Sequence, residues 1–197
     1  MFATMNNRSA ILTEILLKTP EQKILSLFAM NPGRSYYVRE MSRKLDLSLG
    51  ATHGGLLALE KARILCSRSI GKTKLFEVEE RNFPAALNAF RILNTVLILE
   101  PLVELLKSHS RLIILYGSYA RGTFTLESDL DLFIVSDERE AVLSELNDFL
   151  RSFEIDVRPV IKGQVEWMEM ERTAPEFFHE IREGLTLWEK QVNESGF

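Results

Sequence analysis

The sequence has few of the features that mark secreted or membrane-spanning proteins. It holds one cysteine in 197 residues, Cys66, which excludes an internal disulfide and a zinc site built from cysteines. No apolar run is long enough to cross a bilayer, because the best candidate, Val96 to Leu99, ends at Glu100-Pro101. Polar residues at positions 6–8 interrupt any signal-peptide pattern. These absences predict a cytoplasmic protein with no membrane partner.

Repeats and low-complexity segments are also missing, and the composition is that of a globular protein. The net charge of −4 is unevenly spread. Residues 1–80 hold 12 Lys and Arg against 8 Asp and Glu, whereas residues 81–197 hold 12 against 20. This asymmetry indicates a basic module joined to an acidic one.

The segment Leu112 to Val135 reads as two apolar strands joined by a Gly-Ser turn and a polar connection. The second strand carries Asp129 and Asp131, and side chains two apart in a strand project to the same face. Two such carboxylates repel each other and lose solvation, so they need a compensating cation. A divalent metal would supply it; the alternative is an edge strand with a solvated face.

Ten residues separate Gly117-Ser118 from Asp129, which gives the pattern G-S-x10-D-x-D. In this pattern the sequence resembles the minimal nucleotidyltransferases of the DNA polymerase beta-like superfamily. The resemblance implies that Gly117 and Ser118 cradle the phosphates of an NTP, with ATP as the first expectation. It also implies that Asp129 and Asp131 hold Mg²⁺, with two ions in the site.

A third acid is expected on a neighbouring strand. Over residues 153–160 apolar and polar residues alternate, and Asp156 falls on the polar face. The resemblance makes Asp156 the third catalytic acid, a metal ligand that also helps to activate the acceptor hydroxyl. Arg121, four residues past the glycine, either neutralises phosphate charge or forms a surface salt bridge.

The N-terminal part reads as helices followed by a hairpin. Residues 9–18 have helical spacing, although a strand is an alternative, and Thr19 opens a helix with a capping box. Residues 35–45 predict a second helix and Ser48 caps a third to about Ala62. Residues 64–70 and 74–78 then alternate around Gly71-Lys72. This order resembles the winged helix-turn-helix domain of regulator-like proteins that carry a minimal nucleotidyltransferase.

That resemblance implies double-stranded DNA as a partner. In a helix-turn-helix the start of the second motif helix meets base edges, and basic residues around it and on the wing meet phosphates. The residues predicted to contact DNA are Ser48, Gly50, Thr52 and His53 at base edges, Arg39, Arg43 and Lys44 at phosphates, and Arg68, Lys72 and Lys74 on the wing, at phosphates or in the minor groove. The alternative is a docking or dimerisation module whose basic residues form a solvated face.

A long helix is predicted from Pro84 to about His109, with a break at Pro101 as an open alternative. Its many apolar residues favour a homodimer, or burial between two domains. The expected fold class is α+β: an N-terminal winged helix-turn-helix over 1–80, a linking helix over 81–110 and a C-terminal mixed-sheet nucleotidyltransferase domain over 111–197.

Two functions follow from this reading. The first is a Mg²⁺-dependent nucleotidyltransferase that moves AMP from ATP to a protein or small-molecule hydroxyl. By resemblance to antitoxins of the minimal branch, a partner toxin is one acceptor. The second is a DNA-binding transcriptional regulator whose transferase domain is inactive and senses nucleotide.

Overall fold

The computed structural model describes residues 7–151 and 156–191, and the chain divides into two compact units. Among the described residues, the N-terminal unit comprises residues 7–97 and 122–127. The C-terminal unit comprises residues 98–121, 128–151 and 156–191. The short segment 122–127 therefore packs within the N-terminal unit, although the chain on either side of it belongs to the C-terminal unit.

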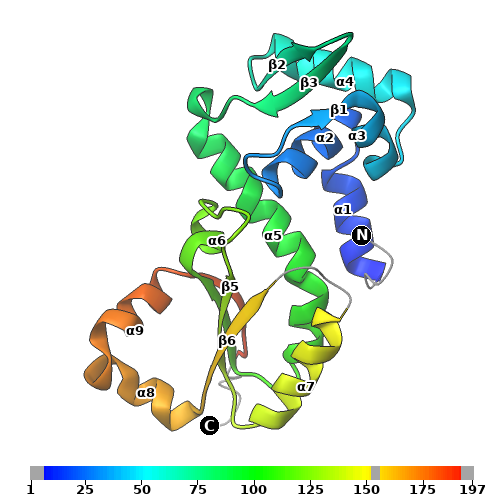
Figure 1. Ribbon diagram of the computed structural model, residues 1–197. Helices are drawn as coiled ribbons and strands as arrows, with labels where there is room; N and C mark the ends of the chain where they lie inside the picture. The colour runs from blue at the N-terminus through cyan, green and yellow to red at the C-terminus, as the bar shows by residue number, and fades with distance from the viewer. Residues whose placement is uncertain (1–6, 152–155, 192–197) are drawn as a thin grey trace. The chain divides into compact units, whose positions relative to one another are not determined.

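The N-terminal unit is a winged helix-turn-helix, as predicted. Its elements are α1 (Asn7–Leu16), α2 (Pro20–Ala29), β1 (Tyr36–Tyr37), α3 (Val38–Leu45), α4 (Leu49–Lys61), β2 (Leu65–Ile70), β3 (Thr73–Val78) and the 3-10 helix η1 (Glu80–Asn82). The three strands form an antiparallel sheet in the order β1-β3-β2, seen at one end of Figure 1. The helical alternative for residues 9–18 is the correct one.

Local sequence signals fix the ends of these helices. The Thr19 side chain accepts a hydrogen bond from the Gln22 backbone, and the Gln22 side chain accepts one from the Thr19 backbone, which completes the predicted capping box. Asp46 ends α3 in the left-handed conformation at φ +51°. Gly71 turns the β2–β3 hairpin at φ +61°, a conformation that glycine adopts without steric cost.

The core of this unit lies between α2, α4 and the sheet. Its buried members are Ile24, Phe28, Tyr36, Met41, Leu56, Leu59, Leu65 and Phe76. Gly55 of α4 lies against α2 so closely that a Cβ on it would be 2.8 Å from Cδ1 of Ile24. The absence of a side chain at position 55 is therefore what lets the two helices approach each other.

The prediction of a helix over residues 35–45 was wrong at its start. Tyr36 and Tyr37 form β1, paired with Phe76 and Leu75 of β3, and α3 begins only at Val38. Tyr36 is fully buried, with its ring 5.3 Å from that of Phe28. Burial of a large aromatic ring against the sheet outweighs the helical spacing of the segment.

The long helix α5 (Pro84–Leu106) continues through Pro101 and ends three residues before the predicted His109. Its part up to Leu97 belongs to the N-terminal unit. There the buried guanidinium of Arg91 donates to the carbonyl oxygens of Ala29 (3.2 Å) and Gly122 (3.4 Å) and to the carboxylate of Glu80 (2.7 Å). This one side chain joins α2, α5, η1 and the segment 122–127.

The C-terminal unit is built on a mixed four-stranded sheet, which confirms the predicted fold class. After the end of α5 its elements are β4 (Leu112–Tyr116), α6 (Gly117–Arg121), β5 (Leu130–Val135), α7 (Arg139–Leu150), β6 (Val157–Lys162), α8 (Gln164–Thr173), α9 (Pro175–Arg182) and β7 (Leu185–Glu189). The strand order is β6-β5-β4-β7. In this sheet β5 and β6 pair in parallel across the α7 connection, whereas β4 pairs antiparallel with β5 and with β7.

Helices cover both faces of this sheet, with α8 and α9 on one face and α7 on the other (Figure 1). Ile114 and Tyr116 of β4 and Phe133 and Val135 of β5 pack against α8 and α9. Strand alternation places Asp131 on the same face of β5 as Phe133. The predicted site residue thus stands at the end of the face that α8 and α9 cover.

The connection from β5 to β6 differs from a simple capped helix. The N-cap of α7 is Glu138, whose backbone N–H donates to the Ser136 hydroxyl. Asp137 instead accepts from the backbone of Gln164 at the start of α8. The third strand was expected over residues 153–160, whereas β6 begins at Val157, and residues 153–155 lie outside the described part of the chain.

Within the described part of the chain, no helix is both long enough and apolar enough to cross a membrane.

Candidate active site and DNA-contacting surface

The candidate active site is built where β4 ends and β5 begins. Gly117 follows directly on Tyr116 and is buried at φ +69°, in the left-handed region that favours glycine. From it the short helix α6 carries Ser118, half-buried, and Arg121, exposed at the last position. The predicted phosphate-binding residues are therefore gathered in one turn.

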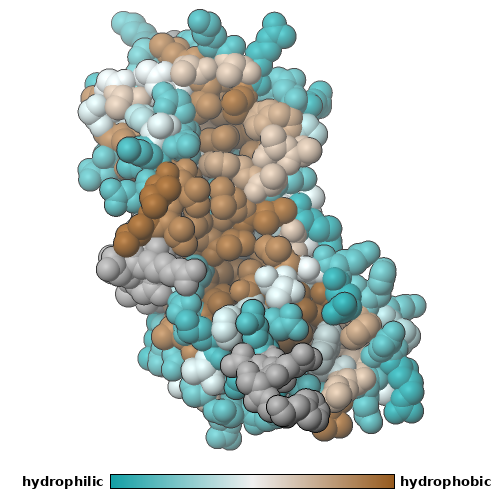
Figure 2. All heavy atoms as spheres, turned by 180° about the vertical axis from the view of Figure 1, so that it is seen from behind, coloured by the Kyte–Doolittle hydropathy of each residue, from teal (hydrophilic) through white to brown (hydrophobic). Residues whose placement is uncertain are grey.

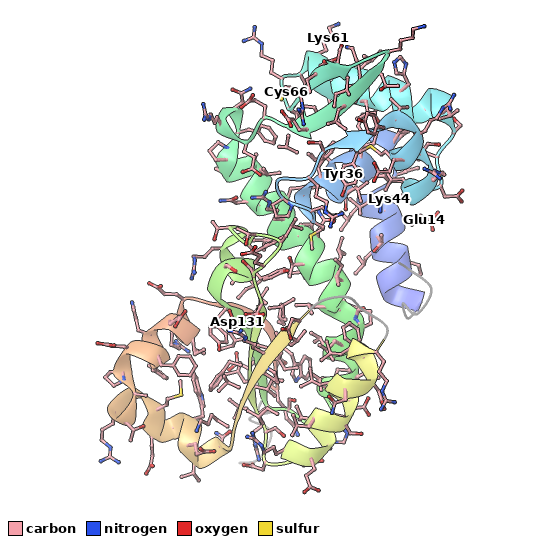
Figure 3. All side chains as sticks on the ribbon, in the orientation of Figure 1. Glu14, Tyr36, Lys44, Lys61, Cys66 and Asp131 are labelled. Atoms are coloured by element: carbon pink, nitrogen blue, oxygen red, sulfur yellow. The ribbon has the colours of Figure 1, made fainter. Side chains whose placement is uncertain are left out.

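Asp131 lies directly against this turn. In the β4–β5 register it pairs with Tyr116, and a Cβ on Gly117 would stand 2.5 Å from Oδ2 of Asp131. Figure 3 labels Asp131 at the end of the sheet where β5 begins. The glycine is thus required twice, for its backbone conformation and for the room that the carboxylate takes.

The electrostatics of the pair match the expectation from sequence. Burial, and then the negative charge of Asp129, raise the pKa of the Asp131 carboxyl above its ordinary value. The positive charges of Arg158 and Arg121 lower it, and Glu180 raises it. The surroundings of Asp131 therefore hold too little positive charge for its carboxylate, and an additional cation at the site would supply it.

Asp129 already has one cationic partner. Nη2 of Arg158 in β6 lies 2.7 Å from Oδ2 of Asp129. The side chain of Asp129 is 22% exposed, whereas that of Arg158 is 69% exposed. The ion pair therefore joins a mostly buried carboxylate to a largely solvent-exposed guanidinium. The sequence alone did not predict this pairing.

Asp156 is adjacent to the pair along the sheet but does not close a cluster with it. Its carbonyl oxygen accepts a hydrogen bond from the Leu130 backbone, at 2.9 Å, and its side chain is exposed. Among residues 7–151 and 156–191, no three His, Cys, Asp or Glu side chains are grouped closely enough to hold a metal ion. Of the three acids expected to lie together, Asp129 and Asp131 are neighbours and Asp156 does not join them.

Two residues that the sequence did not single out also face this site. Burial, followed by the charges of Asp131 and Glu180, raises the pKa of the Tyr116 hydroxyl to about 12. Glu180 lies on α9 three residues after Phe177, whose ring is 5.8 Å from the ring of Tyr116. Phe177 and Glu180 share one face of the helix because residues three apart are neighbours. Only the packing of α9 on the sheet reveals this relationship.

The donor set fits a divalent metal. Mg²⁺ takes oxygen ligands and is commonly held by one or two carboxylates together with substrate phosphates and water. The strand was expected to carry both aspartates, but β5 begins at Leu130, so Asp129 directly precedes it. Asp131 and Asp129 still supply two neighbouring carboxylates, whose repulsion favours a cation. Two protein ligands are therefore sufficient for a site that shares its ion with a triphosphate.

The basic residues predicted to meet DNA phosphates are exposed on the N-terminal unit. They are Arg39, Arg43 and Lys44 on α3 and Arg68, Lys72 and Lys74 on the hairpin. Hydrophilic side chains project from the hairpin end of the unit, at the top of Figure 2. Lys74 is partly engaged, since its Nζ lies 3.5 Å from Glu60 and 5.9 Å from the ring centre of Phe76.

The predicted base-contacting residues do not all point outward. Thr52 is fully buried and its hydroxyl donates to the Ser48 carbonyl, so the prediction that it meets a base was wrong. Ser48 is exposed, but its hydroxyl accepts from the Ala51 backbone as the N-cap of α4. His53 is exposed as expected, and Lys61 at the end of α4 is an exposed cation that the sequence analysis did not include.

The comparison with known families agrees with the geometry of the C-terminal unit. Residues 97–184 match the family model described as "Nucleotidyltransferase domain". This part of the chain is a nucleotidyltransferase domain. The match includes the Gly117 turn, both aspartates and Asp156. No curated protein matches the chain.

Three solved structures are similar to the chain at low identity. A homodimeric winged helix-turn-helix DNA-binding domain from Mycobacterium bovis, described as a possible ArsR-family transcriptional regulator, is 16% identical (TM-score 0.34) and is aligned over 53% of this chain and 95% of its own. ZitR from Lactococcus lactis is 20% identical (TM-score 0.37; 73% and 86%). A possible transcriptional regulator from Methanosarcina mazei is 12% identical (TM-score 0.31; 55% and 91%). The winged-helix architecture itself rests on the element order and strand register described above.

Proposed function

We propose that the nucleotidyltransferase domain transfers a nucleoside monophosphate, AMP from ATP in the first instance, to an acceptor hydroxyl in a Mg²⁺-dependent reaction. The observation that supports this most directly is the pair of Asp131 in β5 and Asp129 just before that strand, beside the Gly117 turn. The bound metal would neutralise charge on the phosphates. Asp129 and Asp131 are the side chains that would hold it.

In this reaction the acceptor oxygen forms a bond to the α-phosphorus, and the bond from that phosphorus to the bridging oxygen of the β-phosphate breaks. Pyrophosphate leaves, and the proton of the acceptor hydroxyl passes to a base. We assign the phosphates to Gly117, Ser118 and Arg121, whose backbone, hydroxyl and guanidinium groups suit anions. Asp156 is the proposed base, supported by its place next to Leu130 across the β5–β6 pair.

The test is transfer of label from α-³²P ATP with Mg²⁺, using the intact protein and lysate of a bacterial cell as the source of acceptors. Asp129→Asn and Asp131→Asn should each abolish labelling, since each replaces a charged carboxylate ligand with a neutral amide of nearly the same shape. Persistent labelling by both variants would refute the assignment. A labelled protein band would identify a protein acceptor such as a partner toxin, whereas label in small molecules would point to a small-molecule hydroxyl.

A second candidate is a DNA-binding regulator whose transferase domain binds nucleotide without turnover. The observation that favours it is that Asp129 is paired with Arg158 and that no third acid joins the pair in the described part of the chain. It predicts a higher Tm with Mg²⁺ and ATP, because a ligand that binds only the folded state stabilises it, but no labelled product.

DNA binding by the winged helix is proposed for both candidates. Its support is the row of exposed cations on α3 and the hairpin. Fluorescence anisotropy with random-sequence duplex DNA should show affinity that falls steeply with salt, because bound phosphates release counterions. The double variant Arg68→Ala, Lys72→Ala should weaken binding and reduce the salt slope by about two if each side chain neutralises one phosphate.

Homodimerisation and the domain limits 1–80, 81–110 and 111–197 remain proposals. Exposed apolar side chains one turn apart on α1, Ile11 and Ile15, support a self-association surface on the N-terminal unit. Light scattering of the intact protein, compared with an Ile11→Asp, Ile15→Asp variant, would test it. Limited proteolysis would test the limits by locating the accessible bonds.

A further inference from the structure

Arg158 makes a contact that interferes with the proposed metal site. Its guanidinium lies 2.7 Å from Oδ2 of Asp129, an oxygen that the proposed function gives to the metal. A carboxylate oxygen that accepts a charge-assisted hydrogen bond has fewer lone pairs available to coordinate a metal ion. The guanidinium and a divalent cation therefore compete for Asp129.

The strand register places Arg158 where it can act on both aspartates. In the parallel β5–β6 pair, Arg158 is the partner of Asp131, and it reaches diagonally to Asp129. Its charge also lowers the pKa of Asp131. A single cation on β6 thus does for the pair in part what a metal ion would do.

The ion pair between Arg158 and Asp129 is weak enough for a metal ion to replace the guanidinium. An ion pair with an exposed partner contributes only about 0–1 kcal/mol, and the arginine is the exposed partner. A long side chain that is 69% exposed can change rotamer without disturbing the sheet, whereas the side chain of Asp129, directly before β5, is only 22% exposed. A divalent ion shared with triphosphate oxygens would therefore displace the guanidinium, which is then free beside the phosphates.

We propose that Arg158 is a positioning residue that occupies Asp129 in the metal-free protein and turns to the nucleotide phosphates when a divalent cation takes that carboxylate. The inference rests on the proposed function and adds an order of binding to it. The metal alone must compete with Arg158, whereas metal and triphosphate together give the guanidinium a new anionic partner. Binding of the two ligands is consequently cooperative.

The test uses Arg158→Gln and measures binding, not turnover. Titration of the full-length protein with Mn²⁺, an oxygen-seeking ion visible by EPR, gives the affinity for the metal alone. Titration with α,β-methylene-ATP at saturating Mn²⁺ gives the affinity for the nucleotide. The matched control is Arg172→Gln on α8, which removes the same charge from an arginine that is 80% exposed and 3.9 Å from its partner Glu169.

The two affinities should move in opposite directions. Removing the competitor should tighten binding of Mn²⁺ alone by about 2–5-fold, which corresponds to a surface ion pair. Losing the charge-assisted contact to phosphate should weaken binding of the nucleotide by about tenfold or more. Arg172→Gln should leave both affinities within about twofold of the unmodified protein, because this exposed arginine pairs with Glu169 of its own helix.

Unchanged Mn²⁺ affinity in Arg158→Gln would overturn the inference, and so would a loss of affinity for both ligands, which a mere phosphate ligand or a folding defect would cause. In either case the unmodified protein would still bind Mn²⁺ with the nucleotide, and the proposed function would stand. Failure of the unmodified protein to bind Mn²⁺ with the nucleotide would overturn the proposed function and the inference together.

Discussion

The carboxylate of Asp131 occupies the space that a side chain at position 117 would need, so only glycine fits there. A Cβ on Gly117 would lie 2.5 Å from Oδ2 of Asp131, and the backbone there is at φ +69°. The backbone of the turn after β4 is therefore in close contact with the Asp131 carboxylate of β5. The site depends on this fit as much as on the aspartates themselves.

Gly117→Ala should accordingly damage both stability and ligand binding. A non-glycine residue in the left-handed region costs about 1–2 kcal/mol, and the clash adds to it by forcing Asp131 or the turn to move. Urea unfolding and binding of Mn²⁺ with α,β-methylene-ATP measure the two effects. Gly33→Ala is the control, because Gly33 has φ +74° with no described atom within 4 Å of its Cβ. It should show the backbone cost and normal nucleotide binding; equal binding by both variants would contradict the role of the close contact.

Asp131→Asn should stabilise the metal-free protein at neutral pH. The folded-state pKa of Asp131 lies above its ordinary value of 3.8, so the folded protein holds this proton more tightly than the unfolded chain. Stability is therefore lost as pH rises through that window, and the charged carboxylate is a cost above it. The amide removes the cost. In EDTA, the Tm difference between the variant and the unmodified protein should be largest near pH 7 and vanish below about pH 4. A difference that does not depend on pH would show that charge is not its cause.

The sequence predicted those features that a local pattern carries. The capping box at Thr19, the hairpin turn at Gly71 and the apolar strand from Leu130 to Val135 each form as local chemistry dictates. The aspartate pair was found for the same reason, because alternation along one strand fixes which side chains share a face.

What the sequence missed depends on packing between segments. Thr52 has the position of a base-contacting residue, but the α4 face that packs inward determines that it is buried. The pairing of Arg158 with Asp129 depends on the parallel register of β5 and β6, in which Leu130 pairs with Val157, 27 residues later. The effect of Glu180 on Tyr116 depends on where α9 packs on the sheet. Periodicity within a single segment contains none of this information.

The adjacent glycines of α4 should respond to alanine with opposite signs. Gly54 is exposed and no described atom lies within 4 Å of its Cβ, so Gly54→Ala should stabilise the helix by up to about 1 kcal/mol. At Gly55 the same gain is opposed by overpacking of about 1–3 kcal/mol, because the Cβ would be 2.8 Å from the buried Ile24. Urea midpoints for the two variants should therefore lie on opposite sides of the unmodified protein. Stabilisation by both would mean that α2 and α4 separate freely.

Arg91 should prove to be a main support of the N-terminal unit. Its buried guanidinium satisfies the carbonyls of Ala29 and Gly122 and pairs with Glu80, and it lies 5.7 Å from the ring centre of Phe124. Arg91→Ala leaves two carbonyl oxygens without this donor and opens a cavity. Because Glu80 is 49% exposed and can return to water, we expect a loss of about 2–4 kcal/mol, at or below the usual cost of breaking a buried ion pair.

Two further variants identify the cause of that loss. Arg91→Lys retains a charge for Glu80 but not the fork that reaches both carbonyls, so its stability should fall between those of Arg91→Ala and the unmodified protein. Arg81→Ala removes an exposed arginine of η1 and should change stability by no more than about 0.5 kcal/mol. Urea unfolding followed by circular dichroism measures all three. If Arg91→Lys were as stable as the unmodified protein, charge alone would account for the effect. If Arg91→Ala matched Arg81→Ala, the contacts of the Arg91 guanidinium would contribute nothing to the fold.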